Sequence, residues 1–189
     1  QYFKDPEPNQ KIVATPGHGT HVPVWLLGSS LFSAQLAARL GLPYSFASHF
    51  APRMLSQAVQ LYRENFQPSE YLEQPYVSMG VPTVVAKTDA EAQHLATSAY
   101  QRVLGLMRGQ SLKLKPPVES MDHIWTPAER ISVNNFYALG QIGSPETVKA
   151  GLQDLLEHVD VDEFIFTCDI YDTEKRLENF SLLMDIKNS

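Results

Sequence analysis

The sequence VPVWLLGSS at residues 22–30 places a short apolar run directly before a glycine and two serines. Such a run is typical of a strand in a parallel sheet, where both faces are covered. Residues 31–40 then repeat apolar side chains at helical spacing, and Gly41 follows as a C-cap. The stretch therefore predicts a strand over 22–27, a tight turn at Gly28, and a helix that begins at once.

The same unit recurs along the chain. Further strands are predicted at 44–50, 76–86 and 163–168, and helices after Pro52, from Thr88 to about residue 108, after Ser144 and after Asp172. The last helix is expected to turn four side chains inward: Leu177, Phe180, Leu183 and Met184. Four strand–helix units predict an α/β fold with a parallel sheet. A four-stranded doubly wound sheet and half of a TIM (β/α)8 barrel both remain open.

The chain is expected to form a single domain over residues 1–189, with two irregular segments. Residues 1–21 are rich in proline, glycine and polar side chains, which predicts an N-terminal loop. Residues 110–143 interrupt the alternation of strands and helices and contain a capping box that starts at Thr126. They predict an insertion, or a lid, that carries a short helix.

Composition excludes several classes of protein. The net charge is −6, so the basic footprint that general nucleic-acid binding needs is missing. No apolar run approaches the roughly 20 residues of a membrane span. Cys168 is the single cysteine, which leaves no internal disulfide and no multi-cysteine zinc site. We expect a cytoplasmic protein with neither a nucleic acid nor a membrane as partner.

The turn after residue 27 is the first candidate site. Gly28, Ser29 and Ser30, with Ser33 one turn later, place hydroxyls and free backbone N–H groups at a helix N-terminus, where a phosphate or a carboxylate can bind. Simple N-capping by Ser29 or Ser30 explains the same residues. The local pattern does not decide between the two.

Histidines give weaker signals. His49 ends the second predicted strand, where residues of a parallel barrel face the active-site mouth, although a structural histidine fits as well. His18 and His21 are three residues apart in a glycine-rich loop, but a third metal ligand is not apparent. The sequence contains no P-loop, no G-x-G-x-x-G after a strand, no G-x-S-x-G and no H-E-x-x-H.

Several blocks resemble the luciferase-like flavin-dependent monooxygenases. They are 22-VPVWLLGSS-30, 34-AQLAARLGLP-43 and 46-FASHFAP-52, followed by 143-GSPETV-148 and the ending from Ile170 through Leu183. The resemblance covers nearly the whole chain. It implies a TIM barrel of which these residues form the C-terminal half, about strands five to eight.

The resemblance also implies a cofactor and a reaction. The family uses reduced flavin mononucleotide (FMN) with dioxygen on a small organic substrate, in some cases with a separate flavin reductase as partner. Leu27, Ser29, Ser30 and Ser33 match phosphate-contacting positions, although an acidic residue stands at the place of Ser29 in bacterial luciferase. With Gly28 and His49, they are the predicted cofactor-binding residues. The family's catalytic positions belong to the first four strands, so no catalytic residue is assigned, and we expect these residues alone to be inactive.

Half of a barrel would leave two open edges, at the strands of Val24 and Ile165. This predicts self-association as a homodimer or a higher oligomer; a truncated chain whose native form is the complete barrel is the other explanation. Two further functions remain open: a non-catalytic half-barrel module that oligomerises without flavin, and a phosphate-handling barrel such as a sugar-phosphate isomerase.

Overall fold

The computed structural model describes residues 2–188, so Gln1 and Ser189 of the predicted single domain lie outside it. All strand pairs are parallel. The strands β1 (Leu26–Gly28), β2 (Tyr44–Phe46) and β3 (Val77–Val85) lie side by side in chain order, and β5 (Glu163–Thr167) pairs with the other side of β3. A short strand, β4 (Gln141–Gly143), pairs with the end of β3. The predicted α/β fold with a parallel sheet is confirmed, with one strand more than the sequence indicated.

Helices follow the strands at the predicted places. They are α1 (Leu31–Leu40), the 3-10 turn η1 (Pro52–Met54) leading into α2 (Leu55–Asn65), α3 (Asp89–Met107), α4 (Pro127–Phe136), α5 (Pro145–His158) and α6 (Thr173–Asn188). The caps explain the boundaries. Thr126 and Glu129 form the predicted capping box of α4, Ser144 accepts from the amide of Thr147, and Gly41 ends α1 with a φ of 60°.

The strand β3 changes partners at Pro82. Residues Ser78–Pro82 pair with β5, whereas Thr83–Val85 pair with β4. Because proline has no N–H to donate, the ladder has a natural break at this residue. Beyond Pro82, Val84 packs in a second core with Ala92, Ala96 and Ile170, whereas Val85 packs in the main core.

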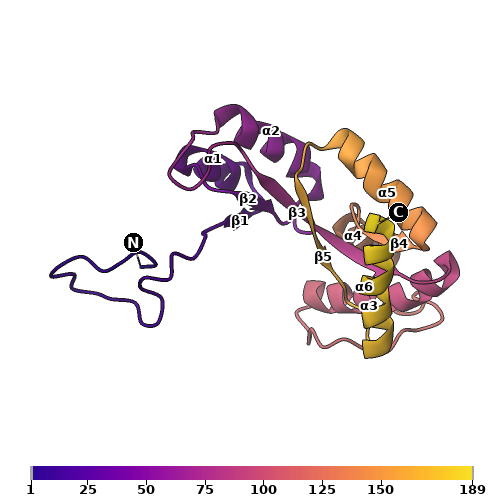
Figure 1. The fold of residues 1–189 in the computed structure, drawn as a ribbon. Helices are drawn as coiled ribbons and strands as arrows, with labels where there is room; N and C mark the ends of the chain where they lie inside the picture. Colours follow the sequence, from indigo (N-terminus) through magenta and orange to yellow (C-terminus); the bar gives the residue numbers. More distant parts are fainter. Residues whose placement is uncertain (1, 189) are drawn as a thin grey trace.

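The main core lies on one face of the sheet. Side chains of α1, α2, α5 and α6 pack there against the larger strand residues, among them Tyr44, Phe46 and Met79. In Figure 1, α1 and α2 lie over the β1–β2 end, and α5 and α6 lie toward the β5 end. A doubly wound sheet would carry helices on both faces.

The opposite face is open, contrary to the expectation of strands covered on both sides. Leu27 on β1 is 69% exposed, and Ile165 on β5 is 45% exposed. The outermost helices are also apolar on their outer sides: α1 exposes Phe32, Leu36 and Leu40, and α6 exposes Leu177, Phe180 and Met184. Only Leu183 of the four α6 side chains expected inside is buried, because no element among residues 2–188 covers the rest.

All four predicted strands are shorter in the structure, β1 and β2 by the most. β1 begins at Leu26, whose amide donates to the carbonyl of Pro43; the preceding residues, including Val22 and Val24, are exposed and unpaired. β2 ends at Phe46, because the chain then turns and the amide of Phe50 donates back to the carbonyl of Ala47. His49 therefore lies in the turn after β2, not at its last residue.

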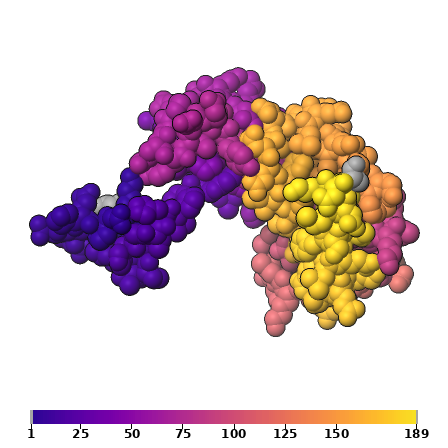
Figure 2. Space-filling model, viewed as in Figure 1, coloured from indigo at the N-terminus to yellow at the C-terminus, as the bar shows by residue number. Residues whose placement is uncertain are grey.

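Residues 2–25 contain neither helix nor strand, and they form an arm that stands out from the rest of the molecule (Figures 1 and 2). A salt bridge of 2.8 Å between Lys4 and Glu70 ties the arm to the body. Residues 110–143 pack on α3 through Met121 and Val133, which share a small core with Val103 and Leu104. Among residues 2–188, no helix combines the length and the apolar character that a bilayer crossing requires.

Candidate functional site

The β1–α1 turn is built around Gly28. A Cβ atom at this position would lie 2.3 Å from the hydroxyl oxygen of Ser33 and 2.4 Å from its Cβ, so only glycine fits. Ser30 is the N-cap residue of α1, and its hydroxyl accepts from the amide of Ser33 at 3.2 Å. The Ser33 hydroxyl in return accepts from the amide of Ser30 at 3.3 Å. This closed capping box holds the turn rigid against the strand.

Ser33 is committed to this internal network. Its hydroxyl donates to the carbonyl of Ser30 at 2.7 Å and lies 3.0 Å from the hydroxyl of Tyr44, and the residue is buried. Burial raises the pKa of the Tyr44 phenol, so that group stays protonated. The structure therefore places the Ser33 hydroxyl behind the turn, where it supports Ser30.

Ser29 is different. It is half-buried, and its hydroxyl makes no hydrogen bond within residues 2–188. The backbone N–H groups of Leu31 and Phe32 in the first turn of α1 have no intrahelical partners either, as at any helix start. Capping accounts for Ser30 and Ser33, whereas these three donors remain free at the positive end of the helix dipole.

Beside the turn, the open face of the sheet forms a cleft of about 410 Å³. Its floor comes from one face of the sheet, which Leu27, Ser45, Gly80 and Ile165 share by the strand register. Other lining residues are Trp25, Phe46, Ala47, His49, Phe50 and Thr167. The cleft is mostly apolar and lies toward the carboxyl ends of the strands, the end at which parallel sheets bind ligands.

His49 stands at the edge of this cleft. A Cβ atom at Gly80 would lie 3.6 Å from its Nδ1, so the ring sits over the bare backbone of that glycine. Its centroid is 4.3 Å from that of Phe50 and 5.8 Å from that of Phe136. Burial lowers its pKa, the charge of Arg102 lowers it further, and the carboxylate of Asp169 opposes them.

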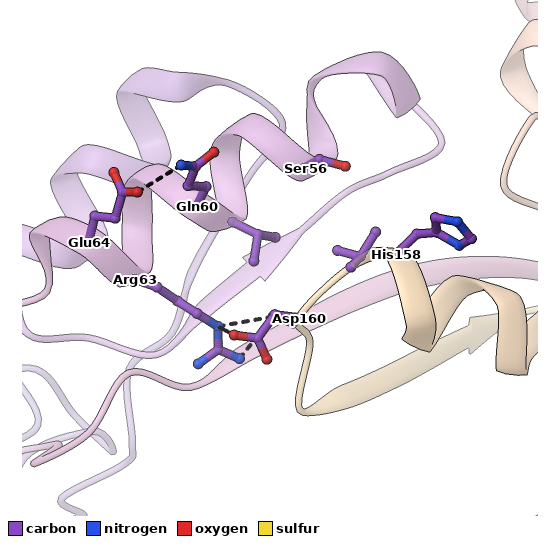
Figure 3. Close-up of a pocket in the computed structure, with 8 residues that line it drawn as sticks. Ser56, Gln60, Arg63, Glu64, His158 and Asp160 are labelled. Atoms are coloured by element: carbon purple, nitrogen blue, oxygen red, sulfur yellow. Dashed lines mark hydrogen bonds and ion pairs between the residues drawn. The ribbon is translucent and has the colours of Figure 1, made fainter.

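A second cavity lies at the opposite, amino end of β5 (Figure 3). Arg63 of α2 crosses it and binds the carboxylate of Asp160 at 2.8 Å and that of Asp162 at 2.9 Å. Asp162 also accepts from the amide of Val77 at 2.7 Å, which fixes the start of β3. This cluster ties elements together far from the cleft, so we assign it a structural role.

The two histidines of the N-terminal loop do not share a ligand site. His18 bonds to the carbonyl of Ala14 and His21 to Asp5, so the two imidazoles have separate partners. No group of three or more potential metal ligands occurs within residues 2–188.

The sequence analysis missed Arg102, Tyr137 and Asp169, which lie with His49 around a smaller cavity. The one local signal was the position of Asp169, two residues after a strand.

The chain is similar to known proteins over nearly its whole length. A family model described as luciferase-like monooxygenase matches residues 2–163. A luciferase-like monooxygenase of Escherichia coli (strain K12) is 45% identical over 186 residues, which are 98% of this chain and 56% of that protein. The chain thus spans about half the length of the curated relatives that it matches.

Solved structures share the fold. Apo-MsnO8 aligns with a TM-score of 0.75 at 26% identity, over 97% of this chain and 56% of that one. The oxygenating constituent of 3,6-diketocamphane monooxygenase from Pseudomonas putida, a type II Baeyer–Villiger monooxygenase in complex with FMN, aligns with a TM-score of 0.56 at 18% identity, over 90% of this chain and 50% of that one.

These similarities define the structural class of the chain. It is an α/β protein with a parallel sheet, and its structural neighbours are of the TIM-barrel luciferase-like type. The chain belongs to the luciferase-like monooxygenase family. The resemblance of the blocks 22–30, 34–43 and 46–52 is confirmed. These relatives do not favour the alternative of a non-catalytic assembly module.

Proposed function

We propose that this chain is the C-terminal part of a flavin-dependent monooxygenase that uses reduced FMN and dioxygen on a small organic substrate. Family membership supports the reaction class. The observation that carries the cofactor assignment is the β1–α1 turn, where the unpaired Ser29 hydroxyl and two free N–H groups follow Leu27, a residue that lines an apolar cleft. A phosphate can accept from all three donors without a lysine.

The residues present fit the two parts of FMN in different ways. Ser29 and the amides of Leu31 and Phe32 would hold the phosphate, while Ser30 and Ser33 keep the turn in shape. Leu27 and His49 would flank the ring and exclude water from it. When bound, reduced flavin supplies the electrons that activate dioxygen. The catalytic residues remain unassigned.

We further propose that β1, β2, β3 and β5 are strands five to eight of a TIM barrel. Their chain order in the sheet and the packing of α1, α2, α5 and α6 on a single face support this. So do the unpaired edges of β1 and β5 and the exposed apolar stripes of α1 and α6. Further strands of a longer protein would cover these surfaces. Alternatively, a second copy of the chain would cover these surfaces. Light scattering that finds residues 1–189 to be a clean monomer would exclude this alternative.

Other parts of the proposal follow from the family. Residues 110–143 would form the lid over the carboxyl ends of the strands, because Phe136 already reaches His49. A flavin reductase would supply the reduced cofactor. A cytoplasmic location remains a prediction from the composition.

The decisive experiment is titration with oxidised FMN, followed by quenching of flavin fluorescence. Ser29→Ala should weaken binding about 10- to 100-fold, since a hydrogen bond to a charged group contributes about 1.5–3 kcal/mol. Ser30→Ala should weaken binding and also lower stability by about 1 kcal/mol through the lost cap. Ser56→Ala, at the amino-end cavity, is the matched control and should change neither. Equal affinity in Ser29→Ala and the parent protein would contradict the phosphate assignment. A flat titration together with a defined oligomer would favour the assembly module instead.

A further inference from the structure

A small cavity of about 230 Å³ lies between the carboxyl ends of β3 and β5 and the segment 110–143. Its polar lining comes from five residues: His49 from the turn after β2, Arg102 from α3, Tyr137 from the end of α4, Thr167 from the end of β5, and Asp169 from beyond β5. The ring of Phe136 closes one side. His49 and Thr167 also border the proposed flavin cleft, so the two spaces are neighbours.

The charges in this cavity cancel. The Nε and Nη2 atoms of Arg102 lie 2.8 Å and 2.6 Å from Oδ2 of Asp169, and each side chain is less than one-third exposed. No other residue that lines the cavity carries a permanent charge. An anion would therefore have to compete with the carboxylate of Asp169, which disfavours a carboxylate or phosphate as the ligand.

Two polar atoms in the cavity are left without partners. The hydroxyl of Tyr137 and Nδ1 of His49 are both buried and make no hydrogen bond within residues 2–188. Burial raises the pKa of Tyr137, so the phenol remains a donor. Burial also lowers the pKa of His49, which keeps the imidazole neutral. Each unpaired buried polar group raises the free energy of the folded protein. A ligand that forms a hydrogen bond with both groups would therefore be bound.

An apolar groove of about 560 Å³ continues from the cavity. It shares His49 and Phe136 with the cavity, and its walls include the side chains of Phe50, Met54 and Met107. A ligand can therefore place a polar head in the cavity and an apolar body in the groove. Methionine side chains adapt to bodies of different shape.

We propose that this cavity binds the hydroxyl group of a neutral, apolar alcohol, with Tyr137 donating to the hydroxyl oxygen and His49 Nδ1 accepting its proton. A hydroxyl both donates and accepts, so it can offer an acceptor to Tyr137 and a donor to His49. A carbonyl has no proton for His49, and a carboxylate faces Asp169. The role as a substrate subsite rests on the proposed function, whereas the binding itself does not.

The test uses cyclohexanol as the probe and the 15N resonances of the histidine rings as the readout, with the protein free of flavin. His49 is assigned by comparison with His49→Gln. We expect cyclohexanol to shift the His49 Nδ1 resonance in a saturable manner. Cyclohexanone should bind more weakly, and cyclohexanecarboxylate should not compete.

Tyr137→Phe should weaken cyclohexanol binding about 3- to 10-fold, because one neutral hydrogen bond is lost. Removal of an unpaired hydroxyl should not lower the urea midpoint, so a folding defect is easily recognised. The control is Tyr71→Phe, on the arm side of the molecule, which should bind as the parent does. Equal cyclohexanol affinity in Tyr137→Phe, or tighter binding of the carboxylate, would overturn the proposal.

The flavin proposal and the alcohol proposal can be refuted independently of each other. Tyr137→Phe should leave FMN affinity unchanged, and Ser29→Ala should leave cyclohexanol affinity unchanged. Cyclohexanol binding without FMN binding would refute the flavin assignment and keep the alcohol site. The reverse pattern would refute the alcohol site alone.

Discussion

Replacement of Gly28 by alanine tests how the β1–α1 turn is built. The new methyl carbon would lie 2.3 Å from Oγ and 2.4 Å from Cβ of Ser33, closer than any real contact, so Ser33 or the strand must move. Overpacking of this kind costs about 1–3 kcal/mol. The displaced Ser33 also loses its part in the capping box, and a lost cap costs about 0.5–2 kcal/mol. We expect Gly28→Ala to lower the free energy of unfolding by about 3 kcal/mol.

The matched experiment is a double-mutant cycle with Ser33→Gly, measured by urea unfolding and followed by circular dichroism. Ser33→Gly removes both atoms that the methyl group would strike, and alone it loses the Ser33 half of the capping box and the contact with Tyr44. In the Ser33→Gly background, Gly28→Ala should therefore cost much less, with a coupling of at least about 1 kcal/mol. Two costs that add to within about 0.5 kcal/mol would refute the steric explanation.

Three further predictions concern charge. Arg63→Met should lower the free energy of unfolding by about 1–3 kcal/mol, because it leaves the partly buried carboxylate of Asp162 unpaired; an unchanged urea midpoint would contradict this. The Arg108 guanidinium and the amide of residue 126 lower the pKa of Glu129 from 4.5 to about 2, so its stabilisation is present above pH 4.5 and is lost as the pH falls toward 2. Glu129→Gln should flatten this part of the acid unfolding curve. Burial holds the pKa of His49 below 6.5, so the unfolded chain takes up the proton first and stability should fall as the pH drops below 6.5. His49→Gln should reduce that slope, and an unaltered slope would show that the imidazole is not desolvated.

Local signals predicted the units of the fold well. The helix starts at Thr126 and Ser144 and the helix end at Gly41 depend on hydrogen bonds within a few residues, which the sequence carries directly. The β1–α1 turn was predicted for the same reason. The strand β4 was missed because its residues, a glutamine, an isoleucine and a glycine, form no apolar run.

Features that depend on distant contacts were predicted poorly. An apolar run such as 22–27 does not reveal that Leu27 faces an open surface, since exposure is decided by which elements cover the sheet. The same holds for Leu177 and Met184 on α6. The polar cavity was invisible in the sequence, because Arg102, Tyr137 and Asp169 follow no spacing and meet only through the path of residues 110–143.

The strand β3 belongs to two hydrophobic cores at once. Val81 and Val85 pack in the core of α1, α2, α5 and α6, whereas Val84 packs in the smaller core with α3. A disturbance in either core therefore loosens a strand that the other core needs. Although the cores share few side chains, this common strand should make their backbone amides exchange with solvent as one cooperative unit.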